Sequence, residues 1–245
     1  MRRPSKALPL TLALASLCLL GFFAASCGSS GNAHARVVDA ISDQNTAVDV
    51  EVNSTKVFST VQFGNTQPNP PAYDTVPSGA VSLEAVVAGG TTPVINPTNG
   101  SFTGSGQYTI VMTGFSSGTG VTAPSFWSIS DNNTAPTTGN VEFRFINASA
   151  NAANFYPSGL FFYVVQPGQG IGSPAVSNLT IGQGSAYVQE NFNAAGYTIY
   201  VCGAINCGSP QFNVTYQTPT GSIRTLVVVD SGNLIANFLE LNDLN

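Results

Sequence analysis

RVVDAISD at residues 36–43 and RFINASAN at residues 144–151 decide the fold of this chain, because they align with each other without a gap. Three further pairs follow in the same order: VDVEV at 48–52 with LFFYV at 160–164, SGQYTIVMT at 105–113 with TGSIRTLVV at 220–228, and APSFWSISD at 123–131 with LIANFLELN at 234–242. Similarity repeated in the same order indicates an internal duplication. We therefore expect two copies of one folding unit.

Each copy is predicted to be a β-sandwich. Apolar and polar residues alternate in segments such as 81–87, 141–145 and 212–216, which is the pattern of strands with one buried face. Turn-forming clusters separate these segments, and no helical period is evident. The fold class expected is all-β, with two tandem Ig-like antiparallel β-sandwiches at 36–133 and 140–245. The join near 132–139 is short, and we expect a modest interface between the sandwiches.

The N-terminus reads as an export signal. Basic residues precede an apolar run at 8–23, and small residues then lead to Cys27 in the sequence AASC. This ending resembles a bacterial lipobox, with Ala24 at the position where leucine is usual. The prediction is a signal peptide at 1–26, lipidation of Cys27 and a lipidated tether at 27–35. Two alternatives stay open, namely plain secretion and an uncleaved membrane helix at 7–25.

All three interpretations place the body of the protein outside the cytoplasm. A lipid on Cys27 would make the membrane a partner through burial of its acyl chains. Position 29, just after the anchor, holds serine rather than an acidic residue that would signal retention, which favours the outer membrane or the cell surface. The basic residues that follow Cys27 are Arg36, Lys56, Arg144 and Arg224, against twelve acidic residues. Such a chain lacks the basic patch that phosphate contacts need, so nucleic acid is not an expected partner.

The cysteines separate by position. Cys18 lies in the signal and Cys27 is the lipidation candidate, which leaves Cys202 and Cys207 in YVCGAINCG. In an oxidising compartment two thiols at this spacing are expected to close a disulfide across a hairpin loop. A metal site there is disfavoured, because the sequence holds no second thiol pair and its single histidine, His34, falls in the predicted tether.

The opening of the first copy, VVDAISDQNTAVDVEVNSTKVFSTVQFG at 37–64, resembles the start of the domain-of-unknown-function family 4397. Members typically show V-V-H-A-S-P-D, then V-D-V-Y-V-(D/N)-G, and later a P-A-G-type turn. Asp43 and the Val-Asp-Val at 48–50 fit this pattern, and Pro-Ser-Gly at 77–79 stands at the turn. Asp39 replaces the usual histidine. The resemblance implies exported β-sandwich domains, often in tandem, and it implies no activity.

Four acidic residues near the start of the first copy form a weak candidate calcium site, namely Asp39, Asp43, Asp49 and Glu51. Carboxylate oxygens are the ligands that Ca²⁺ prefers, but the spacing is not that of an EF-hand loop. In the second copy Asn151 aligns with Asp43 and Phe161 with Asp49, so the charge is not shared. We therefore interpret Asp43 as a turn residue that bonds nearby backbone N–H groups, and we expect no metal.

The sequence offers little for catalysis. A nucleophilic serine needs an activating base, and the single histidine falls in the predicted tether. Glycosidase chemistry needs two facing carboxylates, and the glutamates in strand patterns occupy positions that face water. We expect no enzyme activity, no catalytic residue and no cofactor.

The aromatic residues give the remaining functional hypothesis. Trp127 aligns with Phe238 and is predicted to be a core residue in both copies, whereas Tyr156 lies in an insertion-like loop at 151–159 suited to recognition. The function predicted is that of a non-enzymatic cell-envelope lipoprotein for surface display, adhesion or binding of an unknown glycan or protein ligand. The alternative is a carbohydrate-binding or envelope-polymer-modifying protein.

Overall fold

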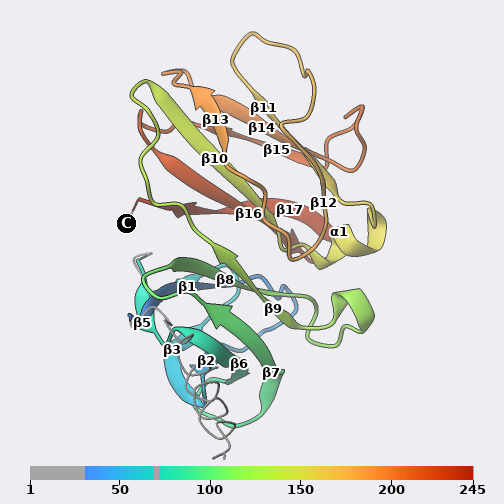
Figure 1. Cartoon of the computed structure of the whole chain (residues 1–245). Helices are drawn as coiled ribbons and strands as arrows, with labels where there is room; N and C mark the ends of the chain where they lie inside the picture. The colour runs from blue at the N-terminus through green and yellow to red at the C-terminus, as the bar shows by residue number, and fades with distance from the viewer. Residues whose placement is uncertain (1–30, 69–71, 245) are drawn as a thin grey trace, which may run out of the picture.

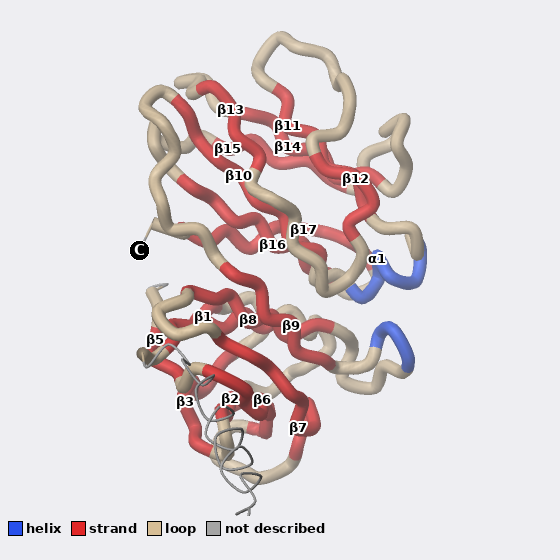
Figure 2. Tube along the Cα trace, in the orientation of Figure 1, coloured by secondary structure: helices blue, strands red, loops and turns tan. Residues whose placement is uncertain are grey.

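The computed structural model describes residues 31–68 and 72–244, and strands dominate this part of the chain. Four sheets pack in pairs, so that two β-sandwiches are stacked one above the other (Figure 1). The all-β class and the sandwich architecture predicted from the alternating pattern are confirmed. Among the described residues a single α-helix, α1 (Ala150–Phe155), and a short 3-10 helix, η1 (Gly120–Thr122), interrupt the strands (Figure 2).

The first sandwich has an inner sheet, which faces the second sandwich, and an outer sheet. The inner sheet has the strand order β4-β1-β8-β9, with β5 also paired to β1. Its strands are β1 (Ala33–Asp39), β4 (Thr66–Gln67), β5 (Asp74–Val76), β8 (Gln107–Thr113) and β9 (Ser125–Ser130). The outer sheet, in the order β3-β2-β6-β7, consists of β2 (Val48–Val52), β3 (Thr55–Val61), β6 (Gly79–Val87) and β7 (Pro93–Phe102). Side chains such as Val50 and Ile110 meet in the core between the two sheets.

The second sandwich repeats this plan. Its inner sheet has the order β13-β10-β16-β17, with β10 (Asn140–Asn147), β13 (Val188–Asn191), β16 (Ile223–Ser231) and β17 (Leu234–Asn242). Its outer sheet has the order β12-β11-β14-β15, with β11 (Leu160–Val165), β12 (Val176–Leu179), β14 (Tyr197–Cys202) and β15 (Phe212–Tyr216). Phe145 and Phe162 stack across the core with ring centroids 4.7 Å apart.

Each inner sheet contains one parallel strand pair, and this pair shows the duplication in the backbone. β1 runs parallel to β8 with Arg36 opposite Thr109, and β10 runs parallel to β16 with Arg144 opposite Thr225. Thr109 and Thr225 are therefore equivalent. The alignment of 105–113 with 220–228 places Thr109 on Arg224 instead, so that alignment is wrong by one residue.

The same one-residue error affects the last strand of each sandwich. In β9 and β17 the residues that face the sandwich cores are Phe126 and Phe238, which makes these two the equivalent pair. Trp127 is the counterpart of Leu239 and is 41% exposed, so its assignment to the core is wrong. A shift of one residue along a strand moves each side chain to the opposite face, which explains why a small alignment error reversed the environment.

The two inner sheets pack against each other through a third apolar core. Its eight buried residues come from both sandwiches: Val38, Ala40, Val111, Ile146, Ala148, Val227, Val229 and Leu241. The two sandwiches are therefore joined by an apolar core of their own. The inner strands are buried on both faces, and such strands carry continuous apolar runs such as Leu-Val-Val-Val at 226–229 rather than strict alternation.

The predicted tether at 27–35 is corrected at its end, because β1 begins at Ala33. Ala33 and Ala35 pack into the first core, and His34 lies in the strand opposite Thr75 and Gln107. The predicted signal peptide, the span at 7–25 and the lipidation site Cys27 lie outside the described residues. Within 31–68 and 72–244, no helix has the length and apolar character needed to cross a membrane.

Candidate ligand site at the junction of the two sandwiches

Two buried arginines hold the sandwiches together. The Arg36 guanidinium of the first sandwich pairs with the Asp243 carboxylate of the second, and Arg144 of the second pairs with Asp131 of the first at 2.5 Å. All four side chains are 0 or 1% exposed. Each arginine therefore neutralises the acid at the end of the other sandwich's last strand, and the four charges balance. We call these four residues the junction cluster.

Hydroxyl groups complete the junction cluster in a nearly twofold arrangement. Nε of Arg36 donates to Thr109, which donates to Asp131 at 2.7 Å. Nε of Arg144 donates to Thr225, which donates to Asp243 at 2.6 Å. Buried charges need this degree of hydrogen bonding to be tolerated away from water.

A tyrosine covers each arginine. Tyr73 donates its hydroxyl to Asp131 at 2.6 Å and Tyr187 donates to Asp243 at 2.8 Å, and each ring centroid lies 4.9 Å from the neighbouring guanidinium carbon. Burial raises the pKa of both tyrosines, and the adjacent carboxylates add to this rise while the neighbouring arginines oppose it. Burial alone would lower the pKa of Arg144, but the two aspartates outweigh it and raise that pKa. Arg144 therefore stays charged and both phenols stay neutral.

Sequence reasoning missed the junction cluster, although it aligned Arg36 with Arg144. The available signal was strong, because the chain beyond Cys27 has four basic residues and two of them occupy the same position of an apolar strand in both copies. An arginine repeated in a buried strand indicates a carboxylate partner.

The four acids of the candidate calcium site do not converge. Among the described residues, no group of three or more His, Cys, Asp or Glu side chains is placed to hold a metal ion. Asp49 is engaged by the N–H groups of Thr60 and Gly89 and by Lys56, and these contacts outweigh burial and lower its pKa. Glu51 lies in β2 opposite Lys56.

Asp43 has a different role from the predicted local turn. Its carboxylate accepts hydrogen bonds from the N–H and hydroxyl of Ser116, at 2.7 and 2.8 Å, across 73 residues of sequence. In the second copy, the Asn151 side chain donates to the carbonyl of Gly232 at 2.9 Å. Both copies therefore use this position to join the loop after their first strand to the loop after the parallel strand, a long-range contact that a local turn rule does not predict.

The local turn contact belongs instead to Asp39 and Asn147. Oδ1 of Asp39 accepts from the N–H of Ile41 at 2.9 Å, and Oδ1 of Asn147 accepts from Ser149 at 3.1 Å. The second side-chain atom differs between the copies. Nδ2 of Asn147 donates to the carbonyl of Leu179, whereas the buried Oδ2 of Asp39 has no hydrogen-bond partner. Burial raises the pKa of Asp39 to about 7.

The predicted disulfide between Cys202 and Cys207 is confirmed, with Cα atoms 5.3 Å apart. It closes the loop between β14 and β15. The hydroxyl of Tyr163 donates to the carbonyl of Ile205 within that loop and fixes it against β11.

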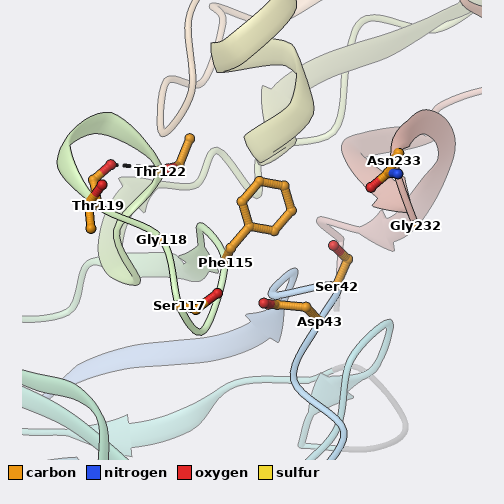
Figure 3. Close-up of a pocket in the computed structure, with 9 residues that line it drawn as sticks. All are labelled: Ser42, Asp43, Phe115, Ser117, Gly118, Thr119, Thr122, Gly232 and Asn233. Carbon is orange, nitrogen blue, oxygen red and sulfur yellow. Dashed lines mark hydrogen bonds between the residues drawn. The ribbon is translucent and has the colours of Figure 1, made fainter.

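Three hollows lie close to the junction. The largest, about 490 Å³, is bordered by the loops that the Asp43 contact joins and by the turn between β16 and β17. Figure 3 shows Ser42, Asp43 and Phe115 of the first sandwich on one side and Gly232 and Asn233 of the second on the other. Its one charged side chain, Asp43, accepts one hydrogen bond from Ser116 on each carboxylate oxygen.

The second hollow, about 340 Å³, is mostly apolar and is also bordered by both sandwiches. Val121 of η1 and Trp127 of β9 come from the first, and Ala153, Tyr156, Pro157, Thr180 and Ile181 come from the second. The loop at 151–159, predicted to be irregular, begins with α1, because the Ser149 hydroxyl accepts from the N–H of Ala152 and caps the helix. This helix places Tyr156 opposite the first sandwich.

A third hollow, about 270 Å³, is bordered by Tyr156 and by residues of the disulfide loop. Because Tyr156 borders both, the second and third hollows are adjacent, and we call them together the aromatic groove. Val121 and Phe155 beside it are 71% and 61% exposed. Exposed apolar side chains gathered around a hollow mark a binding surface more often than scattered ones do.

These features define a class of protein, namely a duplicated β-sandwich pair fused through a buried charged junction, with an apolar groove where the two copies meet. The chain belongs to the family described as Domain of unknown function (DUF4397), whose model matches residues 33–156. That range covers the first sandwich, the linker, β10 and α1, and it confirms the resemblance drawn from the opening motif. A comparison with curated proteins finds no match.

Proposed function

We propose that this protein is a non-enzymatic binding module of the cell envelope, exported and held on the membrane by a lipid on Cys27, that serves surface display or adhesion. The observation that carries the proposal is the aromatic groove, where the exposed side chains of Val121 and Trp127 border a mostly apolar hollow. Solvent-exposed apolar side chains lower the solubility of a protein and do not contribute to its cores. A binding role accounts for their presence at the junction.

The junction cluster supports a passive mechanism. It fixes the two sandwiches relative to each other, with η1 of the first against α1 of the second, so that the groove is formed before a ligand arrives. A preformed site loses less conformational entropy on binding. Carboxylates that could act as catalytic acids or bases form ion pairs within the fold instead. Asp131 and Asp243 pair with arginines in the junction, and Asp49 pairs with Lys56.

Binding is tested with the full chain reconstituted in lipid vesicles and mixed with isolated cell envelopes. Vesicles should co-sediment with envelopes, and Trp127→Ala should lower this binding about tenfold or more. Leu234→Ala is the matched control, because Leu234 is 69% exposed and lies outside the hollows. Equal binding by Trp127→Ala, or no binding by the parent chain, would refute the proposed function.

The lipid anchor is tested separately. Cys27→Ala should release the protein from the membrane fraction into the soluble extracytoplasmic fraction, because no acyl chain remains to bury. Retention of Cys27→Ala in the membrane would support the uncleaved-helix alternative.

A further inference from the structure

The indole of Trp127 rests on a glycine of the opposite sandwich. A Cβ added to Gly182 would lie 2.1 Å from Cε2, 2.2 Å from Cδ2 and 2.4 Å from Nε1 of Trp127. Because these three ring atoms are nearly equidistant from that point, Gly182 lies over the face of the ring rather than at its edge. The side chain is nevertheless 41% exposed and borders the second hollow. Trp127 is therefore packed against the second sandwich on one side and still presents part of its surface to solvent.

Tyr156 is supported in the same way. A Cβ on Gly203 would lie 2.0 Å from Cε1, 2.3 Å from Cδ1 and 2.5 Å from Cζ of the Tyr156 ring. Gly203 follows Cys202 directly, so the disulfide holds this support in place. Two aromatic rings, each packed against a glycine, thus line the second hollow, and Tyr156 also lines the third. Ordered rings lose little side-chain entropy when a ligand stacks on them.

Within the described part of the chain, no charged side chain borders either hollow of the aromatic groove. Polyanions and charged peptides find no opposite charge there, and the desolvation of their charges would go uncompensated. The polar groups at the rim are neutral hydrogen-bonding groups, those of Thr180, Ser209 and Gln211. The lining thus combines aromatic rings with neutral donors and acceptors.

We infer that the aromatic groove binds a neutral glycan chain, a conclusion that rests on the proposed binding function and names its ligand class. Sugar rings present polarised C–H bonds to the electron-rich face of an aromatic ring, and their hydroxyl groups hydrogen-bond to neutral side chains. Trp127 and Tyr156 border adjacent hollows, so successive sugar units of one linear chain contact both rings. Longer oligosaccharides therefore bind more tightly than single sugars.

The chain's single tryptophan reports on the site directly. The full chain in mild detergent is titrated with neutral hexasaccharides of β-linked glucose, β-linked N-acetylglucosamine and α-linked glucose, while tryptophan emission is recorded. At least one should give a saturable change, and the corresponding monosaccharide should bind about tenfold or more weakly. Calorimetry, which does not need the tryptophan, should show about tenfold or more weaker binding for Trp127→Ala and for Tyr156→Ala.

The glycine supports give a second, matched test. Gly203→Ala should displace Tyr156 and weaken hexasaccharide binding, whereas Gly208→Ala should bind like the parent, because a Cβ there meets nothing within 4 Å. Thermal unfolding checks that each variant is folded. Trp127→Phe keeps an aromatic face at an exposed position and should bind the hexasaccharide more tightly than Trp127→Ala does. This comparison tests the site even if Gly203→Ala does not fold.

The outcomes separate the two proposals. If no hexasaccharide binds while envelope binding still depends on Trp127, the glycan inference fails and the binding function stands. In that case, a saturable change in tryptophan emission on adding an uncharged proline-rich peptide would identify a protein ligand. If a hexasaccharide binds equally well to Trp127→Ala and Tyr156→Ala, the assigned site is wrong. If envelope binding is absent altogether, the proposed function fails as well.

Discussion

Asp39 and Asn147 occupy equivalent positions, but one carries an acid and the other an amide. Both make the same contact to the N–H two residues later. Asn147 also has a donor, which satisfies the carbonyl of Leu179, whereas Oδ2 of Asp39 is buried without a partner. The buried carboxyl therefore resists ionisation, and its pKa rises from 3.8 to about 7.

The raised pKa makes stability depend on pH. The folded state holds the Asp39 proton more tightly than the unfolded chain, so this contribution is fully present below about pH 4 and is lost as pH rises through about 7. Asp39→Asn should remove the dependence and raise the free energy of unfolding at pH 8 by about 2–4 kcal/mol relative to the parent, with little difference at pH 4. Urea unfolding at both pH values measures this. A less stable Asp39→Asn at pH 8 would contradict it.

At the scale of single elements, α1 depends on one side chain. The Ser149 hydroxyl caps the helix at the N–H of Ala152 and donates to the buried carboxylate of Asp230. Asp230 also accepts from the N–H of Asn151 at 3.0 Å, so the start of α1 is fixed to the end of β16. The position of the aromatic groove therefore depends on this cap.

Ser149→Ala should lower the free energy of unfolding by about 1–3 kcal/mol, because it removes the cap and leaves the buried Asp230 with one hydrogen bond fewer. Urea unfolding measures the change. Ser158→Ala is the control, since Ser158 lies exposed just after the helix and should change stability little. Equal stability of the two variants would show that the cap does not hold α1.

At the scale of the whole molecule, the junction cluster and the third apolar core fuse the two sandwiches. Removing one arginine leaves two buried carboxylates to share a single guanidinium, so Arg36→Met and Arg144→Met should each lower the free energy of unfolding by about 3–5 kcal/mol. Arg224→Met is the matched control, because Arg224 pairs at 3.1 Å with the solvent-exposed Glu240 and should cost about 1 kcal/mol or less. Chemical denaturation compares the three. A loss in Arg36→Met no larger than in the control would refute the role of the cluster.

The fused junction also predicts how the molecule unfolds. Separation of the sandwiches would expose eight buried apolar residues and four buried charges at once, so both sandwiches should melt in one cooperative transition. Scanning calorimetry should show a single peak whose calorimetric and van't Hoff enthalpies agree. Two resolved peaks would mean that the sandwiches are independent domains.

The sequence alone determined the strands and the duplication. Alternating apolar residues, repeated segments and a cysteine pair five residues apart are local patterns, and local patterns report which segments form strands and hairpins. The family opening at 37–64 and the Cys202–Cys207 disulfide were accessible for the same reason.

The tertiary structure decided which faces those strands bury. Arg36 is a buried junction residue because the inner sheets are covered on both sides, by their own sandwich and by the other copy. Trp127 lies on β9 at the edge of its sheet and remains partly exposed. Alternation in a strand distinguishes its two faces but does not state what covers each one. That assignment depends on contacts between residues more than a hundred positions apart, such as Arg36 with Asp243, which no local pattern encodes.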